Sequence, residues 1–174
     1  IALDKIKEPS IEGLKKGFAN IDKHIRNLQS FGQTVVVAFN RFASDTDEEV
    51  AVIKAHCEAK GIGFAINNAF ALGGEGAVEL AQLVVDTIAN NPSKPLQFAY
   101  EENDSVETKV EKLAKNLYGA KSVQFTGKAK KMIKLINELG VSHYPVCIAK
   151  TQYSFSADPT AYGAADGFEF EISD

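Results

Sequence analysis

Two stretches of the sequence place polar and aromatic side chains directly after short apolar runs. Asn40 and Phe42 follow the run 34–39, and the segment 67–70 follows the run 63–66. An asparagine amide offers both a donor and an acceptor, which suits the polar edge of a purine or pterin ring. An aromatic side chain in a loop can stack on the flat face of such a ring. The two stretches therefore indicate a site for a heteroaromatic ligand.

Each of these residues also has a purely structural interpretation. The polar residues at a strand end can simply cap the helix that follows. Phe42 and Phe70 can fold back onto the core as hydrophobic plugs. The residues alone leave both interpretations open.

Two further segments could contact an anion. Gly73 and Gly74 precede a predicted helix, where glycines let backbone N–H groups approach a phosphate or merely let the chain turn sharply. The sequence lacks a GxxxxGK[ST] motif, which favours the turn. Lys150 follows the apolar run 146–149 and could meet a phosphate or carboxylate, or be a solvated surface lysine.

The sequence predicts neither a catalytic nor a metal centre among these residues. The three histidines lack ligand spacing, and Cys57 and Cys147 lie outside any CxxC pattern, as in a reduced cytoplasmic protein. The net charge of −4 disfavours a nucleic-acid partner. No apolar run is long enough to predict a membrane span.

The first half of the chain must position the two strand-end loops. An apolar stripe predicts a helix from Ser10 to before Gly32, and a capping box of Thr46 and Glu49 begins a second helix. Strands are expected at 34–39 and 63–66, a loop at 67–74 and a third helix at 75–89. This alternation predicts an α/β fold with a parallel sheet and flanking helices. Ligands of such sheets bind outside the carboxyl ends of the strands.

The second half reads as a smaller mixed α/β subdomain. The segment 90–95 is rich in Asn and Pro and predicts a joint, so we expect domains at 1–90 and 91–174. Asp104 and Glu107 predict a capping box for a helix that ends at Gly119. A further helix is expected at 128–139, with strands at 96–100, 122–125, 146–149 and 167–172.

Four stretches in order, KGFANIDKHIRNLQSFG, VVVAFNRFASDTDEE, AFALGGEGAVELA and YPVCIAKTQYSFSADP, resemble the formate–tetrahydrofolate ligase family. The resemblance covers essentially the whole sequence. Because the family is longer and its P-loop lies upstream of these motifs, the chain looks like the carboxyl-terminal third of such an enzyme, and its first half like the end of a P-loop NTPase-like domain. The resemblance implies that ATP, formate and tetrahydrofolate give 10-formyltetrahydrofolate, ADP and phosphate through formyl phosphate. It also implies Mg²⁺, a monovalent cation and a homotetramer.

The resemblance further implies that two aromatics clamp the folate ring. They correspond to Phe42, which follows the Asn40–Arg41 pair, and to Phe70, where the family often has Trp. Ala43 stands where the family usually has Pro. The expected folate-binding residues are thus Phe42, Phe70, Asn40 and Arg41, and the expected ligand-side loop positions are Ala43, Asp45, Gly73, Gly74 and Lys150.

Two expectations concern the segment by itself. Without the upstream phosphate loop, it should neither hydrolyse ATP nor make formyltetrahydrofolate. The alternative is a folate-binding or oligomerisation module with no chemistry of its own.

Overall fold

A computed structural model describes residues 8–148, 155, 156, 158, 160, 161 and 163–174. The chain forms two compact units, Ile1–Leu96 and Gln97–Asp174. Both units combine helices with a small parallel sheet, so the expected α/β class is confirmed.

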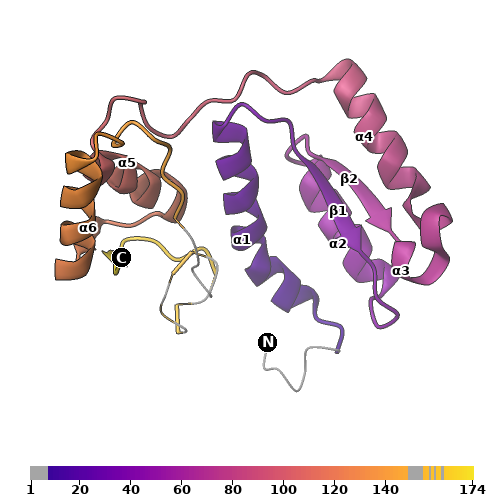
Figure 1. Cartoon of the computed structure of the whole chain (residues 1–174). Helices are drawn as coiled ribbons and strands as arrows, with labels where there is room; N and C mark the ends of the chain where they lie inside the picture. The colour runs from indigo at the N-terminus through magenta and orange to yellow at the C-terminus, as the bar shows by residue number, and fades with distance from the viewer. Residues whose placement is uncertain (1–7, 149–154, 157, 159, 162) are drawn as a thin grey trace. The chain divides into compact units, whose positions relative to one another are not determined.

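The first unit alternates helices with two parallel strands (Figure 1). Its elements in order are α1 (Ile11–Ser30), β1 (Val36–Asn40), α2 (Asp47–Glu58), β2 (Gly63–Asn67), α3 (Ala69–Leu72), the 3₁₀ helix η2 (Gly73–Ala77) and α4 (Val78–Asn90). Strands β1 and β2 pair in parallel from Val36 opposite Gly63 to Asn40 opposite Asn67. The predicted parallel pairing is therefore confirmed, and each strand runs one residue beyond its predicted end.

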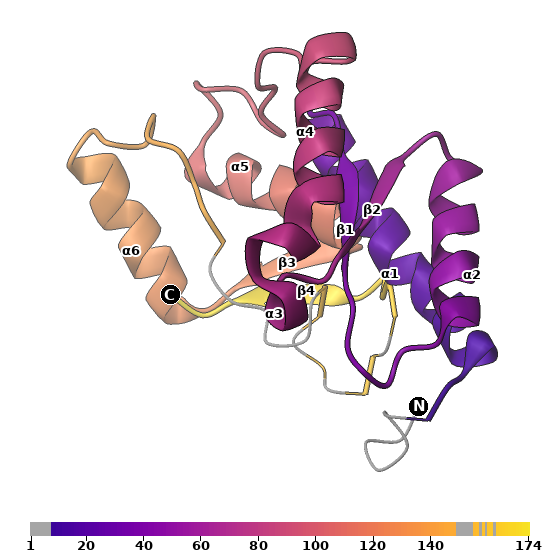
Figure 2. The ribbon, with the colours of Figure 1, turned by 90° about the vertical axis from the view of Figure 1, so that its right-hand side faces the viewer.

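Helices cover both faces of this sheet. Helices α1 and α2 bury one face, where Ile25, Ile53, Cys57 and Ile62 form the core together with apolar side chains of both strands. Helix α4 lies on the other face (Figure 2). There Gly63 lets α4 approach closely, because a Cβ at this position would lie 3.2 Å from the Leu83 side chain.

Side-chain caps define where the helices of the first unit begin. Ser10 caps α1 by accepting a hydrogen bond from the Gly13 N–H. Thr46 and Glu49 form the predicted capping box at the start of α2. The third helix departs from its prediction: residues predicted as its first turn form η2 instead, and α4 begins at Val78.

The second unit contains α5 (Val106–Leu113), a π-helical turn η3 (Ala114–Tyr118), β3 (Ser122–Phe125), α6 (Gly127–Glu138) and β4 (Glu169–Ile172). Gly119, in the left-handed conformation at φ 76°, ends η3, which continues directly from α5, so the helical segment stops at Gly119 as predicted. Strands β3 and β4 pair in parallel, and Phe170 of β4 is buried. Within the described residues, the sheet of this unit consists of this parallel pair.

Three local predictions in the second unit are wrong for identifiable reasons. Residues 96–100 and 146–148 are irregular rather than strands. The Tyr100 hydroxyl accepts from the Val146 N–H at 2.9 Å and donates to the Val146 carbonyl at 3.3 Å, which occupies groups that a strand ladder would need. Ser105, not Asp104, caps α5, because Asp104 is already bound to the Glu101 N–H and the Lys112 ammonium.

Candidate functional site

The candidate site lies on the two loops that leave the carboxyl ends of β1 and β2. Asn40 and Asn67 are the last residues of their strands and lie opposite each other in the register. The Arg41 N–H donates to the Asn67 carbonyl at 3.1 Å, which extends the pairing into the first loop. Parallel pairing in this register brings both loops to one edge of the sheet.

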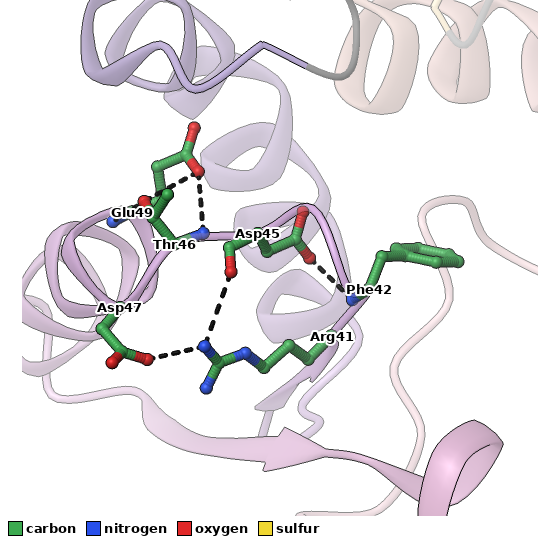
Figure 3. A network of polar contacts seen from close by, with 6 residues as sticks. All are labelled: Arg41, Phe42, Asp45, Thr46, Asp47 and Glu49. Carbon is green, nitrogen blue, oxygen red and sulfur yellow. Dashed lines mark hydrogen bonds and ion pairs between the residues drawn. The ribbon is translucent and has the colours of Figure 1, made fainter.

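In the loop after β1, a tight turn fixes the backbone of Phe42 (Figure 3). The Phe42 N–H donates to the Asp45 carboxylate at 2.8 Å, and the Asp45 N–H donates to the Phe42 carbonyl at 3.0 Å. Phe42 nevertheless remains 64% exposed. The turn therefore holds an exposed aromatic on a defined backbone, and the interpretation of Phe42 as a core plug is wrong in this structure. Its neighbour Ala43 is also exposed.

Arg41 points away from the Phe42 ring and toward the start of α2 (Figure 3). Its guanidinium lies 2.6 Å from the Asp47 carboxylate and 3.5 Å from the Asp45 carbonyl. The Arg41 side chain is 30% exposed, whereas that of Asp47 is 91% exposed. In the described structure, Arg41 thus ties the loop to the helix that follows it.

The same loop is anchored to α1 through Glu49. The Glu49 carboxylate accepts from the Ser10 N–H at 2.8 Å and from the Thr46 N–H at 3.1 Å. These two backbone hydrogen bonds hold the pKa of Glu49 below its ordinary value. Glu49 therefore joins the beginnings of α1 and α2 through the Ser10 and Thr46 N–H groups.

The loop after β2 presents Phe70 from the short helix α3. Phe70 is 97% exposed, so it does not pack into a hydrophobic core. The loop closes where the Asn68 N–H donates to the Gly76 carbonyl at 2.9 Å. A Cβ at Gly76 would lie 2.4 Å from the Asn68 carbonyl oxygen, so only glycine permits this approach.

Gly73 and Gly74, the two glycines predicted as ligand-side positions of this loop, are not crowded by neighbouring backbone as Gly76 is. Gly73 has a φ of +60°, which glycine adopts readily, and its N–H donates to the Ala69 carbonyl. Gly74 has open space around its Cα. The close approach at Gly76 was missed from the sequence. The run Gly73-Gly74-Glu75-Gly76 indicated a turn but not which glycine it requires.

A side-chain hydrogen bond links the two strand ends directly. The Asn67 Nδ2 donates to the Asn40 Oδ1 at 2.8 Å, and the Asn67 Oδ1 accepts from the Ala69 N–H at 3.1 Å. Asn40, Phe42 and Phe70 thus share one edge of the sheet. Lys150 lies outside the described residues.

The part of the chain that the structure describes offers neither a metal-binding group nor a membrane span. Among these residues, no three His, Cys, Asp or Glu side chains gather in a group that could hold a metal ion. In the same ranges, every helix is too short or too polar to cross a bilayer.

Comparison with known proteins identifies the family. The sequence model described as "Formate--tetrahydrofolate ligase" matches residues 1–174. The chain belongs to the formate–tetrahydrofolate ligase family. The predicted resemblance is therefore confirmed.

Curated ligases from several bacteria match along almost the whole chain. The chain is 63% identical over 174 residues to the formate–tetrahydrofolate ligase of Bacteroides thetaiotaomicron and 52% identical over 174 residues to that of Porphyromonas gingivalis. It is 40% identical over 173 residues, 99% of this chain, to that of Caldicellulosiruptor saccharolyticus. In each case the chain spans 31% of the relative's length.

Proposed function

We propose that this chain is the folate-binding segment of a formate–tetrahydrofolate ligase. The complete enzyme would join formate to tetrahydrofolate with ATP, giving 10-formyltetrahydrofolate, ADP and phosphate. The observation that carries the proposal is the pair of exposed rings, Phe42 at 64% and Phe70 at 97%, on neighbouring loops at one sheet edge.

The chemistry of a pterin explains why these side chains would be exposed. A pterin is flat and apolar on its faces but carries donors and acceptors along its edge. Exposed aromatic side chains such as Phe42 and Phe70 offer faces for stacking, and the Asn40 amide offers an edge contact. Arg41 supports the clamp indirectly, since its ion pair with Asp47 holds the loop.

The remaining length of the ligase would supply the phosphate chemistry. Formyl phosphate, Mg²⁺ and a stimulating monovalent cation belong to that proposal, and the described residues offer no three-ligand group for a cation. By itself, the segment would neither hydrolyse ATP nor form the product, because phosphoryl transfer needs groups that neutralise the phosphate charge.

Exposed apolar surface supports docking of this segment onto the rest of the ligase. On α4, Val78, Val85 and Ile88 are 63%, 60% and 66% exposed. Within the described residues, β1 pairs only with β2, so its other edge is open. We propose that the remaining part of the ligase covers both surfaces, and that the assembled enzyme is a homo-oligomer.

The Phe42→Ala variant of a complete ligase carrying these residues tests the clamp. We expect tetrahydrofolate binding to weaken by about 1–3 kcal/mol, by analogy with aromatic stacking on nucleic-acid bases. The Michaelis constant for tetrahydrofolate should rise while that for ATP stays near its original value. Steady-state kinetics with each substrate varied in turn makes the measurement.

Phe98→Ala is a matched control, because Phe98 is 63% exposed and belongs to the second unit. It should leave both constants unchanged. If Phe42→Ala behaved like Phe98→Ala, the aromatic clamp would be refuted.

A further inference from the structure

The hydrogen bonds at the strand ends fix which way two asparagine amides point. The oxygen and nitrogen of such an amide look nearly alike, so their placement is decided by the partners. Here the Ala69 backbone N–H lies 3.1 Å from one end of the Asn67 amide. A backbone N–H can only donate, so that end of Asn67 must be its oxygen.

The orientation of Asn67 then determines that of Asn40. With its oxygen bound to Ala69, Asn67 directs its Nδ2 toward Asn40, at 2.8 Å. A donor there requires the acceptor of Asn40, so the Asn40 Oδ1 faces Asn67. The Asn40 Nδ2, with two N–H groups, is left for other partners. In the described part of the chain we find no acceptor within hydrogen-bond distance of it, and Asn40 is exposed.

We propose that Asn40 donates a hydrogen bond to the ring carbonyl oxygen of the bound pterin, and that Asn67 is a positioning residue that sets this polarity. The inference rests on the proposed folate-binding function. It assigns a direction to the contact: this edge of the site presents a donor, so it selects a ligand with an acceptor at the facing position. An amine at that position would place donor against donor and be rejected.

Two isosteric variants invert the polarity of this edge in different ways. In Asn40→Asp, one carboxylate oxygen still accepts from Asn67, but the outward atom becomes an acceptor. In Asn67→Asp, one oxygen of the new carboxylate still accepts from Ala69, while its other oxygen can only accept. Asn40 must then turn its amide to donate to that second oxygen, which leaves the Asn40 Oδ1 facing outward.

The test measures binding of two probes to complete ligases carrying these variants. One probe is tetrahydrofolate, and the other is its analogue with an amine in place of the ring carbonyl. Calorimetry should show that both variants bind tetrahydrofolate about tenfold more weakly. Their preference for the carbonyl probe over the amine probe should fall by at least about tenfold. Thermal denaturation of each variant reports any loss of folding.

The outcomes separate this inference from the proposed function. If the variants lost stability or affinity but kept the original preference between probes, Asn67 would be merely structural and the inference overturned. The inference would also be overturned if the Asn40 and Asn67 variants changed neither affinity nor preference while Phe42→Ala still weakened tetrahydrofolate binding. In that case the proposed function would stand. If Phe42→Ala left tetrahydrofolate binding intact, the proposed function itself would fail.

Discussion

The two loops at the carboxyl edge of the first sheet present an exposed aromatic ring in different ways. The loop after β1 holds Phe42 through side chains, above all the Asp45 carboxylate on the Phe42 N–H. The loop after β2 holds Phe70 through one side-chain contact, from the Ala69 N–H to Asn67, and through a backbone closure where Asn68 meets Gly76. Both loops therefore use polar side chains, but only the second also depends on the absence of a side chain.

This difference affects how strongly an amino-acid substitution should destabilise each loop. A hydrogen bond to an exposed side chain contributes modestly, because water replaces it when it is lost. A backbone approach that admits only glycine is less tolerant, because any Cβ forces the chain apart. We therefore expect the second loop to be more sensitive to substitution, although Phe70 is the more exposed ring.

Gly76→Ala should have the largest effect of the variants that probe this difference. Its Cβ would lie 2.4 Å from the Asn68 carbonyl oxygen and 2.9 Å from the Ala69 nitrogen, both backbone atoms. We expect the free energy of unfolding of the first unit to fall by about 2–3 kcal/mol. Chemical denaturation of the chain followed by circular dichroism measures this change.

Gly74→Ala is the matched control for that measurement. Gly74 lies in the same 3₁₀ helix, but a Cβ there meets no atom within 4 Å. This variant should leave stability within about 0.5 kcal/mol of the original. Equal effects of the two substitutions would show that the loop is not held by close backbone approach.

Asp45→Ala should have an intermediate effect on the first loop. It removes the acceptor that lies 2.8 Å from the Phe42 N–H. The expected loss of stability is about 1 kcal/mol, since water can reach the freed N–H. Thermal denaturation of the chain measures it.

Ser44→Ala provides the comparison for Asp45→Ala within the same turn. Ser44 is exposed, and we find no hydrogen-bond partner for its side chain among the described residues. If both variants melted at the same temperature, the Asp45 contact would not hold the turn.

The sequence predicted the first unit better than the second, for physical reasons. The first unit follows local rules: an apolar stripe gives α1, the Thr46–Glu49 box gives α2, and apolar runs give a parallel pair. The strand predicted at 96–100 failed because Tyr100 binds the backbone at Val146, a contact 46 residues away. Short apolar runs do not reveal such distant partners.

The candidate site was predictable in its position but not in its internal contacts. Strand-end placement and the family resemblance indicated Asn40, Phe42 and Phe70, and the structure places all three at one sheet edge. The hydrogen bond between Asn40 and Asn67 depends on strand register, which a single sequence does not determine. The requirement for glycine at position 76 depends on how the loop closes onto Asn68, which a single sequence does not determine either.

The smallest expected effect concerns the charge that anchors the first loop. Hydrogen bonds from the Ser10 and Thr46 N–H groups lower the pKa of Glu49. A lowered pKa in the folded state means that the Glu49 carboxylate stabilises the fold at pH values above its unfolded pKa. That contribution is lost as the pH falls through the lowered folded pKa. Near neutral pH, Glu49→Gln should therefore reduce stability by about 0.5 kcal/mol, as for a charge at an exposed helix start.

The pH dependence distinguishes the charge of Glu49 from its shape. Glutamine keeps the length of the side chain but only one of the two oxygens that accept from the Ser10 and Thr46 N–H groups, so the variant mimics the protonated, uncharged Glu49 side chain. Denaturation from about pH 7 to about pH 3 should show the original chain and Glu49→Gln converging in stability as Glu49 becomes protonated. The second loop has no such carboxylate contact in the hydrogen bonds that close it, which join Asn68 to Gly76 and Asn67 to Ala69. A constant difference across this pH range would show that the Glu49 charge does not anchor the loop that carries Phe42.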